Sequence, residues 1–218
     1  VYAYLSSGID IKTSNSFYIY DNKEDLVYQG SGNSEWVDLE DVSPYFLDAI
    51  VSTEDKYFYK HMGFDYLRIA KSFYTNIKNG YISQGGSTIS QQYVKNMYLD
   101  FDKTWSRKIQ EAFLTLKLET HYSKEDILEG YINTINFGQG CYGISEASKY
   151  YFNKSASELS LEEAVILAGI PKAPNTYNPV ANYEKAIKRG KIVAECMLNN
   201  EKIDRNTYDN LFKETLSI

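Results

Sequence analysis

The stretch Ser160-Leu-Glu-Glu-Ala-Val-Ile-Leu-Ala-Gly-Ile170 is the most informative about the fold class. Its first four residues form a capping box, in which the side chains of Ser160 and Glu163 accept from the first free N–H groups of a helix. The apolar run that begins at Ala164 is the longest in the chain. It is nevertheless much shorter than the roughly 18 residues that a membrane-spanning helix needs. We therefore predict a helix near 161–168 and no membrane span.

Similar signals on both sides of this stretch predict further helices. Ser123-Lys-Glu-Asp126 is a second capping box, and Ser43-Pro44 has the N-cap and N1 residues typical of a helix start. Asp65 can cap a helix that stops at Gly80. The expected helices lie near 44–53, 65–80, 88–98, 104–121, 124–133, 161–168, 182–199 and 204–216. Loose alternation in residues 17–28 predicts a short N-terminal β hairpin, so the fold class is mainly α.

The amino-acid composition and the charge of the chain exclude several classes of function. The chain has 218 residues, 43% of them hydrophobic, and a formal net charge of −6, which fits a globular protein and excludes a disordered one. Residues 1–55 hold two basic residues against eleven acidic ones, a balance of −9, so residues 56–218 carry +3. The weak positive charge of residues 56–218 favours anionic ligands and argues against a nucleic-acid partner. Cys141 and Cys196 fit neither a disulfide scaffold nor a zinc site.

A glycine-rich stretch, Gln84-Gly-Gly-Ser-Thr-Ile-Ser-Gln-Gln92, lies at the start of the helix near 88–98. Glycines at a helix start leave backbone N–H groups free to face an anion. Taken alone, this pattern is more typical of a glycine turn followed by an N-cap. The amides Gln91 and Gln92, followed one turn later by Lys95 and Asn96, favour a site for a sugar beside a phosphate.

Glu54 and Asp55 end an apolar helical segment. A carboxylate on a hydrophobic segment is partly desolvated, which suits a general base. A surface Glu-Asp pair that ends a helix is the more ordinary interpretation of this stretch alone. His61 follows in the same stretch, and a lone histidine is more often a structural hydrogen bonder than a catalyst.

The helix near 104–121 has two distinct faces. The apolar stripe, which we expect to be buried, consists of Trp105, Ile109, Ala112, Phe113 and Leu116. The opposite face carries Thr104, Arg107, Lys108, Glu111 and Thr115. Two cations one turn before Glu111 favour its charged form. A solvated face of salt bridges explains the same pattern equally well.

Taken in order, these segments resemble the peptidoglycan glycosyltransferase (transglycosylase) domain of class A penicillin-binding proteins and the monofunctional peptidoglycan transglycosylases, glycosyltransferase family 51. The resemblance covers roughly residues 36–200, and several motifs in order make coincidence a poor explanation. The matching stretches are Glu54–Gly63, Gly85–Asn96, Arg107–Glu111, Ile127–Asn133, Tyr142–Gly143, Ala168–Pro174 and Tyr177–Pro179.

The resemblance implies a lysozyme-like, mainly α fold with a head lobe, a smaller membrane-facing jaw lobe and an active cleft between them. It implies a single domain over 1–218, in which 1–35 is an N-terminal extension. It also implies that a polyprenyl-pyrophosphate-linked glycan is transferred with inversion to the 4-hydroxyl of lipid II, which builds β-1,4-linked strands.

The resemblance also assigns roles to residues. Glu54 matches the family's catalytic carboxylate. Glu111 matches its second carboxylate, and a divalent cation (Mg or Mn) near Glu111 is compatible with the pattern, whereas no organic cofactor is expected. The implied substrate-binding residues are Asp55, Phe58, His61, Gly86, Ser87, Thr88, Gln91, Gln92, Lys95, Asn96, Arg107 and Lys108. The helix over Ile127–Asn133 is expected to support the cleft and not to react.

The implied partners are lipid II, the lipid-linked glycan strand and moenomycin-type inhibitors, at the extracytoplasmic face of a bacterial cell membrane. The membrane surface is expected to meet the jaw lobe through Phe73, Tyr74, Ile77, Tyr81 and Ile82, with Lys71 and Lys78 near anionic head groups; an ordinary helix packed in the core is the alternative. We expect the chain to be part of a longer membrane-anchored protein with a C-terminal transpeptidase domain.

Two positions depart from the family pattern: Lys71 stands where Arg is frequent, and Tyr93 stands where an aliphatic residue is usual. Two other functions remain open at this point. A lysozyme-like muramidase or lytic enzyme also uses a cleft glutamate, but its substrate has no pyrophosphate and needs no anion-binding stretch. A non-catalytic glycan-binding scaffold is disfavoured because both Glu54 and Glu111 are present.

Overall fold

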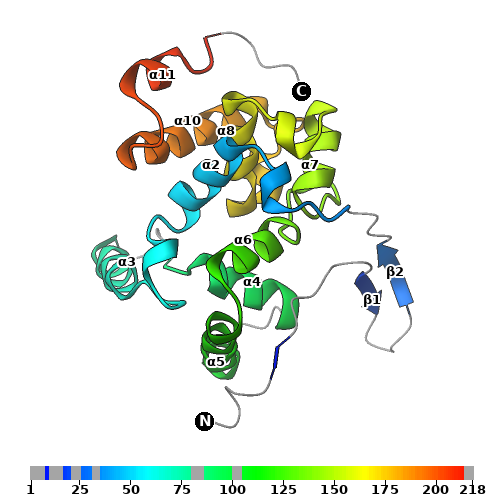
Figure 1. The fold of residues 1–218 in the computed structure, drawn as a ribbon, viewed down its shortest axis with the longest axis vertical. Coiled ribbons are helices and arrows are strands. Elements are labelled where there is room, and N and C mark those ends of the chain that lie inside the picture. Colours follow the sequence, from blue (N-terminus) through cyan, green and yellow to red (C-terminus); the bar gives the residue numbers. More distant parts are fainter. Residues whose placement is uncertain are drawn as a thin grey trace. The chain divides into compact units, whose positions relative to one another are not determined.

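The structure is a computed structural model that describes residues 8–9, 17–20, 26–30, 35–79, 86–99 and 105–213 (Figure 1). Its α-helices are α2 (Pro44–Glu54), α3 (Tyr66–Asn79), α4 (Ile89–Tyr98), α5 (Trp105–His121), α6 (Lys124–Ile132), α7 (Ile144–Phe152), α8 (Leu161–Gly169), α9 (Pro174–Tyr177), α10 (Tyr183–Asn199) and α11 (Arg205–Asn210). Short 3-10 helices are η1 (Leu39–Asp41), η2 (Phe58–Lys60), η3 (Ala156–Glu158) and η4 (Ile170–Lys172). The predicted mainly α class is confirmed.

Most predicted helices are found within one or two residues of their expected ends. The helix α11 is shorter than expected, because it ends at Asn210 and not near 216. The helix α7 is absent from the sequence-based expectation. It begins after Gly143, whose φ is 87°, and no side chain caps its first turn. A helix that starts without a capping side chain leaves no signal of the kind that identifies α8.

Two short strands lie in the region where the sequence predicts a hairpin. The strand β1 (Phe17–Tyr20) pairs antiparallel with β2 (Leu26–Gly30), with Phe17 opposite Gly30. The register shifts after Ile19, so that Tyr20 lies opposite Leu26. The expected turn at residues 21–23 lies outside the described residues.

The chain divides into two compact units, which are described separately. Unit 1 consists of residues 1–11 and 54–131, and unit 2 consists of residues 12–53 and 132–218. The boundaries fall just before the last residue of α2 and just before the last residue of α6. No change in composition marks either point, and the sequence predicts no internal boundary.

In unit 2, α8 and α10 pack side by side (Figure 1). The predicted capping box is present: Ser160 N donates to Glu163 Oε2 over 2.8 Å, and Glu163 N donates to Ser160 Oγ over 3.3 Å. Every residue of α8 except Glu162 is buried. A Cβ added to Gly190 of α10 would lie 2.9 Å from Ile166 Cδ1, so this glycine permits the close approach of the two helices.

In unit 1, α4 packs against α5 (Figure 1). The buried side chains here include Ile89, Tyr93 and Val94 of α4 and Leu118 of α5. Polar and charged side chains occupy many of the remaining buried positions. All the candidate site residues from Glu54 to Lys108 belong to this unit.

Candidate functional site

The N-terminus of α4 is held by a network of buried side chains. Thr88 is the N-cap, and it forms a capping box with Gln91. The hydroxyl of Thr88 also donates to the carbonyl of Gly63 over 2.7 Å. The carboxylate of Asp55 accepts from the backbone N–H of Ile89 over 3.0 Å, at the positive end of the helix dipole. The start of α4, which follows the glycine-rich stretch, therefore has hydrogen-bond partners within the protein itself.

Asp55 also holds His61. The Nε2 atom of His61 lies 3.0 Å from both carboxylate oxygens of Asp55, so Nε2 is the protonated nitrogen. The Nδ1 atom of His61 is buried and has no hydrogen-bond partner among the described residues. The carboxylate is fully buried, as is the ring of Phe58. This arrangement fixes the loop between α2 and α3.

Glu54 ends α2 and is held through both its side chain and its backbone. Its Oε2 atom accepts from Gln92 Nε2 over 2.9 Å. Its backbone carbonyl accepts from the guanidinium of Arg68 on α3, and the backbone N–H of Arg68 donates to Asp65 Oδ1 over 2.9 Å. Asp65 thus caps α3 as predicted. Arg68 gave no signal in the sequence, because its partner is a backbone atom fourteen residues away.

Glu111 is buried among cationic and amide groups. Its Oε1 atom accepts from Gln91 Nε2 over 3.2 Å and from the ammonium of Lys108. Its Oε2 atom lies 3.9 Å from Arg107 Nη1. Only 2% of the Glu111 side chain is exposed, whereas 47% of the Lys108 side chain is exposed. The carboxylate therefore orients cations that reach solvent.

The predicted burial of the apolar stripe of α5 is wrong at two positions, whereas Ala112 and Leu116 are half-buried and the side chain of Trp105 lies outside the described residues. Ile109 and Phe113, which we expected to be buried, are 57% and 38% exposed, whereas Thr115 and Glu111 of the polar face are buried. Thr115 donates its hydroxyl to the backbone carbonyl of Glu111. The apolar stripe follows the usual rule that apolar residues face the core. In this helix the polar face has partners inside unit 1, and these partners decide which face is buried.

Lys95 of α4 is half-buried in the same charged environment. Burial lowers the pKa of Lys95 from its ordinary value, and the nearby cations Arg107 and Lys108 lower it further. Glu111 and Glu54 act in the opposite direction. The structure therefore brings Lys95, Arg107, Lys108 and both carboxylates of the sequence prediction into one electrostatic cluster.

The other predicted substrate-binding residues fall into two groups. Gly86, Ser87, Gln92 and Lys95 are partly exposed and Asn96 is exposed, so a ligand can reach them. The remaining group has little or no exposed surface and makes the internal contacts described above; its members are Asp55, Phe58, Thr88 and Gln91. In this structure these four side chains position other groups, and their direct contact with a substrate stays a prediction.

A further buried network links α4, α5 and α6. Glu119 of α5 accepts from Ser90 Oγ, and its Oε1 atom also accepts from Lys124 Nζ over 2.7 Å. The ammonium of Lys124 lies 4.5 Å from the centre of the Phe58 ring. Nothing in the sequence predicted this network, in which Lys124 comes from the capping box Ser123–Asp126 and Glu119 comes from the preceding helix.

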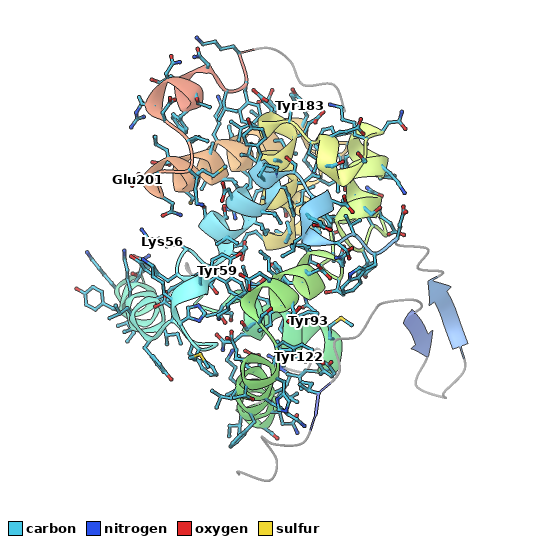
Figure 2. All side chains as sticks on the ribbon, in the orientation of Figure 1. Lys56, Tyr59, Tyr93, Tyr122, Tyr183 and Glu201 are labelled. Atoms are coloured by element: carbon cyan, nitrogen blue, oxygen red, sulfur yellow. The ribbon has the colours of Figure 1, made fainter. Side chains whose placement is uncertain are left out.

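Tyr93, one of the two departures from the family pattern, is fully buried. It comes from α4, and its side chain lies near Tyr122 at the end of α5 (Figure 2). Within the part of the chain that the structure describes, its hydroxyl has no hydrogen-bond partner, and burial raises its pKa above the ordinary value. A Cβ added to Gly130 of α6 would lie 2.6 Å from this hydroxyl, so Tyr93 faces α6. Lys71, the other departure, is exposed.

Exposed apolar side chains extend over α3 and the loop before it. Tyr66, Leu67, Tyr74 and Ile77 of α3 are between 65% and 81% exposed, and Met62 is 65% exposed. We name the residues Tyr57, Tyr59, Met62, Tyr66, Leu67, Ile69, Tyr74 and Ile77 the α3 surface. Figure 2 labels Tyr59 and Lys56 in the loop between α2 and α3. The side chain of Phe73 and residues 81–82, which we expected to contribute, lie outside the described residues.

The described residues do not form a metal site of their own. They contain no group of three or more His, Cys, Asp or Glu side chains that could hold an ion. Glu111 is the one carboxylate proposed for this role, and Lys108, Gln91 and Arg107 surround it. A divalent cation there would need most of its ligands from groups other than these side chains.

Comparisons with known proteins show the family of this chain. A model of the transglycosylase family matches residues 23–198. The chain belongs to this family. Penicillin-binding protein 2D of Bacillus subtilis is 49% identical to this transglycosylase chain over 182 residues, which is 84% of the chain and 26% of that protein. Penicillin-binding protein 1A/1B of the same organism is 40% identical over 205 residues, which is 93% of the chain and 22% of that protein.

The transglycosylase chain therefore spans about a quarter of the length of these relatives. Among solved structures, penicillin-binding protein 1A from Haemophilus influenzae is 23% identical and has a TM-score of 0.49. The match covers 96% of the transglycosylase chain and 22% of the penicillin-binding protein 1A chain. This likeness is too weak to support a conclusion. Across the described residues, no helix is long and apolar enough to span a bilayer.

Proposed function

We propose that this chain is a peptidoglycan glycosyltransferase that polymerises lipid II into β-1,4-linked glycan strands. The observation that carries the proposal is the cluster in unit 1, where the carboxylate of Glu54 lies with Lys95, Arg107, Lys108 and Glu111. A glycosyl transfer from a pyrophosphate needs a base for the acceptor and cations for the leaving group. This cluster contains both.

Glu54 is the group that takes the proton. In an inverting transfer, the acceptor 4-hydroxyl oxygen forms a bond to the donor's anomeric carbon while the bond from that carbon to the pyrophosphate oxygen breaks. The hydroxyl proton goes to Glu54. The hydrogen bond from Gln92 holds Oε2 of this carboxylate in place, and Glu54 as a whole residue is 9% exposed.

Lys95, Arg107 and Lys108 stabilise the negative charge that develops on the leaving pyrophosphate. Since pyrophosphate is a weak base, charge stabilisation matters more than protonation by a general acid. Glu111 holds two of these cations in fixed positions. The lowered pKa of Lys95 has a clear cause, because burial and two neighbouring cations disfavour its charge until an anion binds beside it.

The α3 surface supports a location at the membrane, where the lipid-linked substrate resides. It joins exposed tyrosines and aliphatic side chains with the exposed lysines Lys56, Lys60, Lys71 and Lys78. Apolar side chains flanked by lysines bind the interface of anionic bilayers. The extracytoplasmic face of a bacterial membrane, moenomycin-type inhibition and a transpeptidase domain in the full-length protein are parts of the same proposal.

Incubation of the chain with labelled lipid II in detergent tests the proposal. We expect glycan polymer from the wild-type chain, and a decrease in rate of about 10²–10⁴-fold in Glu54→Gln, because this change removes the base but preserves the size of the side chain. Glu125→Gln, at an exposed glutamate of α6, is the matched control. Shortening of preformed glycan by the wild-type chain would support a muramidase instead, and full activity of Glu54→Gln would refute the assignment of the base.

A further inference from the structure

Tyr131 of α6 is the third member of a chain of hydrogen bonds that ends at Glu54. Its hydroxyl lies 3.2 Å from Gln92 Oε1, and Gln92 Nε2 lies 2.9 Å from Glu54 Oε2. Tyr131 is fully buried, whereas Gln92 is partly exposed. The three side chains come from α6, α4 and the end of α2, and all three belong to unit 1.

The chemistry of the three groups fixes the direction of these bonds. An ionised carboxylate can only accept, so the group of Gln92 that faces Glu54 must be the NH₂ group. The carbonyl oxygen of Gln92 then faces Tyr131, and the phenol must donate to it. Burial raises the pKa of Tyr131 well above its ordinary value, and Glu54 and Asp55 raise it further, so the phenol keeps the proton that it donates.

We propose that Tyr131 is a positioning residue for the transfer reaction: by donating to Gln92 Oε1, it holds the amide in the orientation that donates to Glu54. This inference rests on the proposed function of Glu54 as the base. If the amide rotated by half a turn, its oxygen would face Oε2, which would disfavour the ionised carboxylate. The phenol opposes that rotation, because its own hydrogen would then have to leave the amide oxygen inside a buried site.

Titratable and charged groups also act on Glu54 from α3, from α4, from α6 and from the next residue in the chain. Lys95 interacts with Glu54 from α4, and Arg68 reaches its backbone carbonyl from α3. Asp55 follows it in the chain and Tyr131 faces it from α6. Because Lys95, Arg68 and Asp55 remain in place when only the Tyr131 hydroxyl is removed, the variant Tyr131→Phe tests the hydrogen bond without removing a charged group.

The test compares Tyr131→Phe with Tyr151→Phe. Tyr151 is an equally buried tyrosine of unit 2, and its hydroxyl donates to the carbonyl of Phe137 over 2.8 Å. In Tyr131→Phe we expect kcat for lipid II polymerisation to fall about three- to tenfold, KM to change less than twofold, and the acidic limb of the pH profile to move up by about half to one pH unit. In Tyr151→Phe we expect a lower melting temperature and an unchanged pH profile.

A double-mutant cycle tests whether Tyr131 acts through Gln92. In a Gln92→Met background, we expect Tyr131→Phe to change kcat by less than twofold, because the group that it orients is absent. A full three- to tenfold loss in that background, or an unmoved pH limb in Tyr131→Phe, would overturn the inference. If Gln92→Met has no measurable activity, the acidic limbs of the pH profiles of Tyr131→Phe and Tyr151→Phe decide whether the inference holds.

A measurement without turnover separates this inference from the proposed function. In the chain labelled with ¹³C at glutamate Cδ, the resonance lost in Glu54→Gln identifies Glu54. We expect its titration midpoint to rise in Tyr131→Phe and to stay in Tyr151→Phe. If the wild-type chain makes no polymer but this shift appears, the proposed function fails and the hydrogen-bond chain stands. If polymer forms but neither midpoint nor pH limb moves, the positioning role fails.

Discussion

The helices α8 of unit 2 and α5 of unit 1 use their two faces in opposite ways. In α8 the apolar side chains are buried, as the hydrophobic pattern predicts. In α5 the carboxylate of Glu111 is buried, while Ile109 and Phe113 are exposed. The same contrast holds for the described parts of the units. Unit 2 buries one charged side chain, Glu163, whereas unit 1 buries six: Glu54, Asp55, Asp65, Glu111, Lys117 and Glu119.

The difference shows that the two units are stabilised by different interactions. The interior of unit 2 depends mainly on apolar area removed from water. The interior of unit 1 depends on charged and polar groups that need particular partners, because a buried charge without a partner is very unfavourable. A site for an anionic sugar phosphate requires such groups, and the apolar side chains that they displace face outward.

The largest expected effect comes from one substitution made in both helices. Ile166→Gln in α8 should lower the free energy of unfolding by about 4 kcal/mol or more, because it loses a buried aliphatic group and buries an amide. Ile109→Gln in α5 should change it by less than about 0.5 kcal/mol. Denaturation in urea measures both. Equal effects of the two substitutions would mean that α5 does not expose this face.

The second test removes the cationic partner of a buried carboxylate in each unit. Lys124→Met leaves Glu119 buried with the hydroxyl of Ser90 as its remaining described partner, and we expect a loss of about 3 kcal/mol or more. Lys154→Met removes the corresponding partner of Glu163 in unit 2. Since 41% of the Lys154 side chain is exposed, we expect about 1 kcal/mol or less. A larger loss in Lys154→Met, measured by thermal and urea unfolding, would reverse the contrast between the units.

The third test concerns the contact of α4 with α6. Gly130→Ala would normally stabilise a helix by about 1 kcal/mol, but here the new Cβ would lie 2.6 Å from the hydroxyl of Tyr93. We expect a loss of about 1–3 kcal/mol. Adding Tyr93→Leu should restore most of it, because the shorter side chain leaves room for the methyl group. Calorimetry of the single and double variants checks this, and additive losses would show that the two side chains do not meet.

The smallest expected effect on stability comes from Lys95→Met. The pKa of Lys95 is lower in the folded chain than in the unfolded one, so its charge opposes folding at neutral pH. The penalty is full below the folded pKa and disappears as the pH rises to about 10.5, the unfolded value. We therefore expect Lys95→Met to raise the melting temperature slightly at pH 7 and to lose this advantage near pH 10. Polymerisation should decrease strongly, because a cation for the pyrophosphate is lost.

The sequence predicted the regular parts of the fold because capping boxes and apolar runs are local signals. The capping boxes of α6 and α8 are present, since each depends on residues three apart. The orientation of α5 could not be predicted in this way. It depends on Gln91, a residue of another helix whose amide binds Glu111.

The sequence predicted which residues belong to the candidate site, but it did not predict what each of them does. The sequence identified Glu54, Glu111 and the cations, which the structure brings together. It could not separate the exposed Asn96 and the half-buried Lys95 from fully buried residues such as Thr88, because all lie in one continuous motif. Arg68 and Tyr131 were missed, because each acts through a partner that is distant in the sequence.

The contacts of Asp55 with Ile89 and His61 have a consequence for variation at position 55. An asparagine there could still accept from the backbone of Ile89, but its NH₂ group would face the imidazole. The oxygen that accepts from Ile89 also lies 3.0 Å from Nε2 of His61, so this single oxygen would have to accept from both groups. The NH₂ group beside it cannot accept from Nε2. Position 55 should therefore tolerate even its isostere asparagine poorly, although its carboxylate is wholly enclosed.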